Sequence, residues 1–130
     1  MTNTASSETK PLVHGYLRME EPDEPVIGLM STDLATVCTR NGFQLGSIFV
    51  DRGVPDDVFA RTGFTNLLDA VRFTHPYAVM VPTLDHLSAR EFVRDALQRM
   101  VKLAGSQVLV VYRVNGRGPL ENGANLAGSL

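Results

Sequence analysis

The chain has 130 residues, 44% of them hydrophobic and 20% charged, which suits one ordinary globular domain with a single core. Its formal net charge of −2 excludes a strongly basic protein, so the overall balance does not point to nucleic acid. No apolar run approaches the roughly 20 residues of a membrane span, and the polar N-terminus does not resemble a secretory signal. The single cysteine, Cys38, cannot form an internal disulfide, and we expect a buried thiol in a cytoplasmic protein.

Both ends of the chain are predicted to be irregular. Residues 1–11 are polar and rich in serine and threonine, as is typical of a disordered lead-in. Residues 115–130 contain four glycines, one proline and three asparagines, which break helices and strands alike. We therefore expect one domain over residues 12–114, followed by a flexible C-terminal tail.

The first half of that domain predicts a strand, a helix and a second strand. Residues 12–19 form the first strand, and a Pro- and acid-rich loop covers residues 20–25. Apolar residues then recur as on one face of a helix, at Ile27, Met30, Leu34 and Val37. Asn41-Gly42 supplies the end of this helix, and residues 43–50 form the second strand.

The second half continues the alternation after a loop over residues 51–63. A second helix, ended by His75-Pro76, is indicated by Phe64, Leu67, Leu68 and Val71. Residues 77–81 form a wholly apolar third strand, which is typical of a sheet covered on both faces. A third helix should begin at a capping box of Ser88 and Glu91 and end at Gly105, with inward residues Val93, Leu97, Met100 and Ala104. Residues 107–114 form the fourth strand.

This order predicts a single-domain α/β fold with a mostly parallel central sheet of about four strands, covered by helices on both faces. Functional groups of such sheets gather beyond the carboxyl ends of the strands. The residues expected there are Arg18, Glu20, Asp51 and residues 83–86.

Four segments at these strand ends resemble, in the same order, motifs of the serine recombinase (resolvase/invertase) N-terminal catalytic domain. The first matches Tyr-x-Arg-x-Ser, the second an aspartate followed by glycine, the third Arg-Pro-Gly-Leu and the fourth Leu-Asp-Arg-Leu-x-Arg. In chain order they are Tyr16-Leu17-Arg18-Met19-Glu20, Phe49-Val50-Asp51-Arg52-Gly53, Arg61-Thr62-Gly63-Phe64 and Leu84-Asp85-His86-Leu87-Ser88-Ala89. The resemblance spans residues 12–114 and implies a resolvase-like fold.

The resemblance also implies a serine nucleophile at position 20 and phosphate-holding arginines at positions 18, 61, 86 and 89. Here Glu20 replaces the serine, and His86 and Ala89 replace two of the arginines. Like charges about 4 Å apart repel by roughly 4 kcal/mol at an effective dielectric of about 20, so an ionised Glu20 opposes a phosphate. We therefore predict a catalytically inactive domain, a pseudoenzyme, with remnant site positions Tyr16, Arg18, Glu20, Asp51, Arg61, Asp85 and His86.

Several structural alternatives accompany this prediction. Ser31, in Ser31-Thr32-Asp33, resembles the family's nucleophile motif, but only ten residues separate it from Gly42, so we expect a helix serine. Asp51 and Asp85 fit either a site or the capping of local N–H groups. Arg18 and Asp85 fit a structural ion pair. Glycines and a proline over residues 116–123 exclude the long helix that follows the last strand in the family.

Three functions remain open, and apart from the Mg²⁺ of the third, none involves a cofactor. The first is a regulatory or protein-interaction module whose partner is another protein, a second copy of the chain included. The second is weak, salt-sensitive DNA binding through Arg52, Arg61, Arg72, Arg90, Arg94, Arg99 and Lys102. The third is a receiver-like Mg²⁺ site built from Glu20, Asp51 and Asp85.

Overall fold

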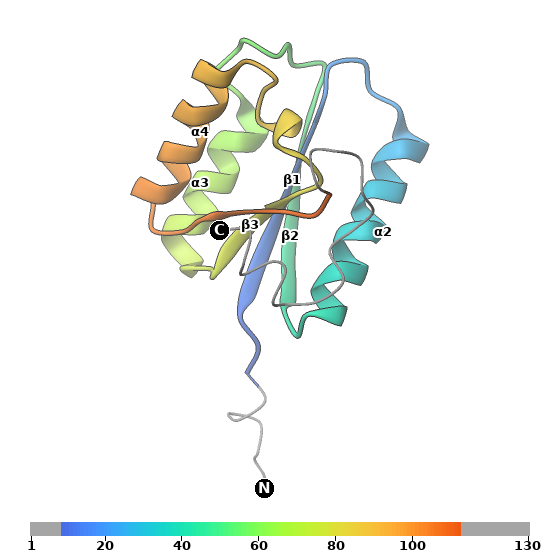
Figure 1. Cartoon of the computed structure of the whole chain (residues 1–130), viewed down its shortest axis with the longest axis vertical. Coiled ribbons are helices and arrows are strands. Elements are labelled where there is room, and N and C mark those ends of the chain that lie inside the picture. The colour runs from blue at the N-terminus through green and yellow to red at the C-terminus, as the bar shows by residue number, and fades with distance from the viewer. Residues whose placement is uncertain (1–8, 113–130) are drawn as a thin grey trace, which may run out of the picture.

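The central sheet has four parallel strands in the order β2-β1-β3-β4. They are β1 (Leu12–Met19), β2 (Gln44–Arg52), β3 (Ala78–Val81) and β4 (Val108–Val110). The computed structural model describes residues 9–112, and Figure 1 shows how its helices flank the sheet. The parallel α/β fold predicted from the alternation of apolar patterns is confirmed.

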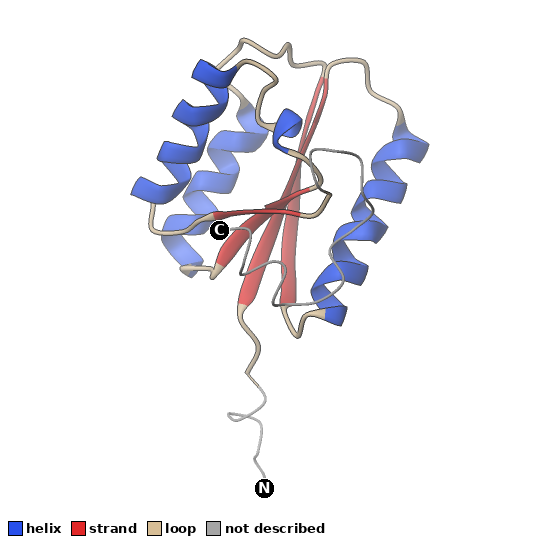
Figure 2. Cartoon of the chain, in the orientation of Figure 1, coloured by secondary structure: helices blue, strands red, loops and turns tan. Residues whose placement is uncertain are grey.

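The helices lie on both faces of the sheet, as Figures 1 and 2 show. Helix α2 (Glu24–Arg40) covers one face, and α3 (Thr62–Thr74) and α4 (Glu91–Leu103) cover the other. Side chains of β1 alternate between the two cores, because successive strand residues point to opposite faces. Leu17 belongs to the core under α2, whereas Tyr16 belongs to the core under α3 and α4.

The first loop is shorter than the sequence predicted. Helix α2 begins at Glu24, because the Asp23 side chain accepts a hydrogen bond from the Val26 N–H and caps the helix. Pro25 lies in the first turn, where its missing N–H leaves no helix hydrogen bond unmade. The loop after β1 is therefore residues 20–23 instead of residues 20–25.

The start of α4 was predicted wrongly. Its N-cap is Arg90, and the buried Ser88 is not part of a capping box. The Ser88 hydroxyl instead donates to the Asp56 carbonyl at 3.1 Å and accepts from the Arg90 N–H at 2.9 Å. Along α4 the inward residue of the third turn is Val101, while Met100 is 37% exposed.

The other helix ends agree with the predictions. Asn41 is the C-cap of α2, and Gly42 follows it with a φ of 73°. His75 ends α3 in the left-handed conformation, with a φ of 52°. Strand β2 continues to Arg52, so that Asp51 lies within the strand and not beyond it.

Parts of the predictions fall on residues that the structure does not describe. Residues 1–8 and 113–130 lie outside the described range, which includes most of both predicted irregular ends and the last two residues of the predicted fourth strand. Over residues 9–112, no helix is long and apolar enough to cross a lipid bilayer.

Candidate functional site

A hollow of about 400 Å³ lies beside the carboxyl ends of β1 and β3. Its lining brings together four carboxylates and one arginine, with an imidazole beside them. The charged and titratable lining residues are Arg18, Glu20, Glu21, Asp56, Asp85 and His86. The hollow therefore carries an excess of negative charge and opposes a phosphate group.

Arg18 lies at the end of β1, and all the hydrogen bonds of its guanidinium are made to neighbouring loops. It donates to the carbonyls of Val54 at 3.0 Å, Asp85 at 2.9 Å and His86 at 3.3 Å. It also forms an ion pair with the Asp56 carboxylate at 2.9 Å, and its side chain is only 10% exposed. The ion pair expected between Arg18 and Asp85 is therefore formed with Asp56, while Asp85 contributes its backbone carbonyl.

Asp56 completes this cluster, although the sequence analysis did not single it out. Its carboxylate accepts from the Ala89 N–H at 3.0 Å as well as from Arg18. Partial burial raises the pKa of this carboxyl, but the Ala89 N–H and the charges of Arg18 and Arg61 outweigh burial, so the pKa lies below its ordinary value. The chain's own Asp56 carboxylate thus occupies the place beside Arg18 where an external anion would otherwise bind.

His86 replaces an arginine of the resembled motif with a neutral group. Its Nδ1 accepts a hydrogen bond from the Arg18 backbone N–H at 3.0 Å. Burial, assisted by the charge of Arg18, lowers the pKa of His86 to about 4. The imidazole is therefore uncharged at neutral pH and supplies no cation to the hollow.

Tyr16, Asp51 and Arg61 form a second group, buried beside the hollow. The Tyr16 hydroxyl donates to Asp51 Oδ2 at 2.7 Å and accepts from Arg61 at 3.4 Å. Asp51 also accepts from the backbone N–H groups of Gly63 at 2.7 Å and Phe64 at 2.9 Å. A carboxylate on β2 thereby caps the N-terminus of α3, where its charge is favourable. Burial raises the pKa of the Tyr16 hydroxyl.

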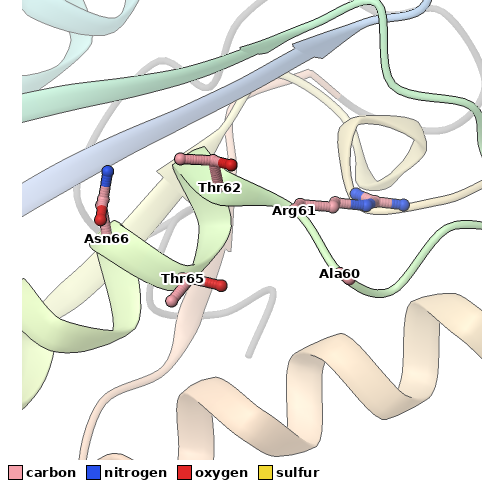
Figure 3. A pocket seen from close by; sticks show the side chains of 5 residues that line it. All are labelled: Ala60, Arg61, Thr62, Thr65 and Asn66. Atoms are coloured by element: carbon pink, nitrogen blue, oxygen red, sulfur yellow. The ribbon is translucent and has the colours of Figure 1, made fainter.

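Arg61 is 1% exposed and holds the loop after β2 against the sheet edge. It donates to the carbonyls of Val58 at 2.6 Å, Asp56 at 3.1 Å and His86 at 3.4 Å. Arg61 also helps to line a shallow hollow of about 270 Å³ at the start of α3, together with Thr62, Thr65 and Asn66 (Figure 3). The His86 carbonyl therefore accepts from both arginines that the sequence retains.

The structure divides the predicted site residues into these two groups. Glu20 and Asp85 are exposed and line the hollow with Arg18 and His86, whereas Asp51 faces α3. Among residues 9–112, no three His, Cys, Asp or Glu side chains come close enough to hold a metal ion. The Mg²⁺ alternative, which needs Glu20, Asp51 and Asp85 together, has no support in this arrangement.

Ser31 lies within α2, and its hydroxyl donates to the Ile27 carbonyl at 2.8 Å. The prediction of a helix serine is confirmed.

The fold is that of serine recombinase catalytic domains. The C-terminal catalytic domain of ISC1926 TnpA, an IS607-like serine recombinase, matches with a TM-score of 0.70 and 16% identity over 82% of this chain and 71% of that one. The N-terminal catalytic domain of TP901-1 integrase matches with a TM-score of 0.67 and 18% identity over 76% and 75% of the two chains. A resolvase family site-specific recombinase from Streptococcus pneumoniae matches with a TM-score of 0.64 and 13% identity over 92% of this chain and 83% of that one.

At these identities the likeness establishes the fold, which the four strand-end motifs had predicted. No protein-family model matches the sequence, and no curated protein matches it either.

Proposed function

We propose that this chain is a recombinase-like domain that has lost strand-cleavage chemistry and acts as a regulatory module through contacts with other proteins. The observation that carries the proposal is the state of its two retained arginines. Arg18 and Arg61 together donate to five different backbone carbonyls and one carboxylate. Neither guanidinium is available to hold a phosphate unless these contacts break.

Catalysis by a serine nucleophile would need groups that stabilise charge developing on the phosphate. At position 20 this chain carries an exposed glutamate, and the other carboxylates of the hollow surround it. A phosphate entering the hollow would also have to displace Asp56 from Arg18. Each of these departures opposes the attack on the phosphate, so a single substitution should not restore strand cleavage.

Surface charge gives little support to the DNA-binding alternative. Of the seven basic residues considered for it, Arg61 is buried, and Arg52 and Arg72 are paired with Glu24 and Asp69. Arg94 is also paired, with Asp95, so Arg90, Arg99 and Lys102 remain as candidates for a shared basic face. We therefore place protein contacts ahead of nucleic acid.

The first experiment is a fluorescence-anisotropy titration of the protein against a labelled generic DNA duplex, at low and at physiological salt. We expect no saturable binding in either buffer. Tight binding that weakens steeply with salt would overturn the proposal in favour of a nucleic-acid role.

The second experiment tests the loss of chemistry directly. The variants Glu20→Ser and Glu20→Ser/His86→Arg/Ala89→Arg are incubated with supercoiled DNA, quenched with denaturant and examined for covalent protein–DNA adducts. We expect no adduct from Glu20→Ser, because Arg18 still pairs with Asp56 and positions 86 and 89 still lack arginine. A clean adduct from the single variant would contradict the proposal, and the triple variant shows whether the missing arginines account for the difference.

A further inference from the structure

The hollow at the carboxyl ends of β1 and β3 carries carboxylates whose charge the described part of the chain does not balance. Glu20, Glu21 and Asp85 line the hollow and are exposed. Within residues 9–112 none of these three side chains takes part in an ion pair. Arg18, the one arginine of the lining, is neutralised by Asp56. The three charges therefore attract a cation from outside the domain.

The spacing of these carboxylates favours an organic cation over a metal ion. Across the described residues, no three His, Cys, Asp or Glu side chains come close enough to hold a metal. A metal ion needs several oxygen ligands within about 2.0–2.6 Å. A guanidinium instead carries five N–H donors in one plane, which point in several directions. It can therefore contact carboxylates that are spread around a hollow.

His86 adds a polar group to this hollow that has no partner of its own. The residue is only 8% exposed, and its Nδ1 accepts from the Arg18 backbone N–H, so the proton of the neutral ring lies on Nε2. In the described range Nε2 makes no hydrogen bond, and the buried side-chain atom left without a partner there is Asn41 Oδ1. The Nε2–H is therefore open to the hollow that His86 lines.

The remaining lining is apolar. Met19 and Met30 are half-buried at the hollow. Methionine side chains are flexible and adapt to the alkyl stem of a long side chain, such as the one that carries a guanidinium. The N–H of His86 needs an acceptor, which a guanidinium lacks. A peptide backbone that carries an arginine supplies both the cation and the acceptor.

We propose that this hollow binds an arginine-bearing segment of a partner protein. The guanidinium lies among the three unpaired carboxylates, the alkyl stem lies against the two methionines, and a backbone carbonyl of the segment accepts from His86 Nε2. The inference rests on the proposed function, because it gives the chemistry of one protein contact.

Proton–nitrogen correlation NMR of the full chain tests the site, with acetyl-Gly-Arg-Gly amide as the probe. We expect saturable shifts confined to residues 19–21 and 84–89, with a dissociation constant of about 1 mM or tighter. Acetyl-Gly-Gln-Gly amide has the same length without the charge and should give no saturable shift. Shifts centred elsewhere, or none from the arginine peptide, would overturn the inference.

Carboxylate variants test the local charge. Glu20→Gln and Asp85→Asn should each weaken binding of the arginine peptide by roughly threefold, and the double variant by roughly tenfold. Asp57→Asn is the matched control, because Asp57 is an exposed carboxylate that does not line the hollow. Equal losses in all three single variants would mean that binding follows the overall charge, and would overturn the site.

The part of His86 is tested with n-butylguanidinium, which has the cation and an alkyl stem but no carbonyl. The wild type should bind the arginine peptide roughly fivefold more tightly than this ion. In His86→Asn, which keeps an acceptor for the Arg18 N–H, that advantage should disappear while the ion binds as before. Circular dichroism verifies that the variant is folded. An advantage that persists in His86→Asn would overturn the hydrogen bond to the partner backbone.

The peptide titrations contain no DNA, so their failure differs from failure of the proposed function. An arginine peptide that does not bind, together with DNA that does not bind, would overturn this inference alone. Tight, salt-sensitive DNA binding would overturn the proposed function whatever the peptide does.

Discussion

The Tyr16 hydroxyl donates to the Asp51 carboxylate at 2.7 Å, and this pair joins strands β1 and β2 to the first turn of α3. The same carboxylate accepts from two backbone N–H groups of that turn, so one charged side chain satisfies three donors. The role of Asp51 is therefore structural.

Replacing Asp51 with asparagine should destabilise the domain by about 2–4 kcal/mol. The amide keeps one acceptor oxygen but turns an NH₂ toward a buried donor, and the negative charge at the helix N-terminus is lost. Tyr16→Phe should cost about 1 kcal/mol, because it removes a single hydrogen bond. Urea unfolding of both variants and of the double variant measures the coupling. Strictly additive losses would show that the two side chains act independently.

Gly63→Ala should destabilise the domain although alanine favours helices. A Cβ at Gly63 would lie 2.8 Å from the Asp51 carboxylate, which is fixed by its hydrogen bonds. Gly28→Ala in α2 is the matched control, because nothing lies within 4 Å of its added Cβ. That variant should gain up to about 1 kcal/mol. Thermal unfolding of both variants gives the comparison, and a stabilised Gly63→Ala would contradict the tight contact.

Arg18→Lys should loosen the loop after β2 and the turn η1 (Leu84–His86). A lysine cannot make all four hydrogen bonds of the Arg18 guanidinium, so we expect the free energy of unfolding to fall by about 2 kcal/mol. Hydrogen exchange should accelerate over residues 53–61 and 84–89 and not in α2. Arg52→Lys alters only an exposed pair with Glu24 and should leave exchange and unfolding nearly unchanged. Equal effects from both substitutions would argue against the structural role of Arg18.

His86 should make the domain sensitive to mild acid. Its pKa is lowered to about 4 in the folded state by burial and by Arg18, whereas the unfolded chain takes up the proton near the ordinary value of 6.5. The free energy of unfolding that the neutral His86 contributes is therefore fully present above about pH 6.5. It is lost as the pH falls toward 4, by roughly 3 kcal/mol in total.

Urea unfolding between pH 7 and pH 4 measures this loss. His86→Asn, which keeps an acceptor for the Arg18 N–H, should flatten the profile. Part of the acid sensitivity should persist in that variant, because burial also lowers the pKa of His14. The exposed His75→Asn should follow the wild type, and a His86→Asn profile identical to that of the wild type would refute the assignment.

The hydrophobic pattern predicted the order of strands and helices because burial on a sheet face or a helix face imposes its own period. The limits of β1 and the C-caps of α2 and α3 agree with this pattern. Ser88 was misassigned as an N-cap because its hydroxyl binds the Asp56 carbonyl, 32 residues away in the chain. No local pattern contains that contact.

The sequence predicted which residues lie at the candidate site, but not which of them form hydrogen bonds and ion pairs with one another. Motif spacing and the parallel sheet bring Arg18, Glu20 and Asp85 to one edge, and the structure places them there. The ion pair considered for Arg18 was with Asp85, whereas the structure forms it with Asp56, which was missed. The sequence Pro55-Asp56-Asp57 marks only a polar turn, and the loop's path across the sheet edge decides which carboxylate reaches the guanidinium.

By itself, the sequence determined the parallel α/β fold, the strand ends that carry polar residues, and the absence of a serine at position 20. These are local properties of periodicity, turn chemistry and residue identity. Only the tertiary structure decided that Arg18 and Arg61 are consumed by backbone carbonyls, that Asp51 caps α3, and that Phe92 and Leu103 lie exposed on one face of α4. Hydrogen bonding and exposure depend on atoms brought together from distant parts of the chain, so they follow from the packed fold.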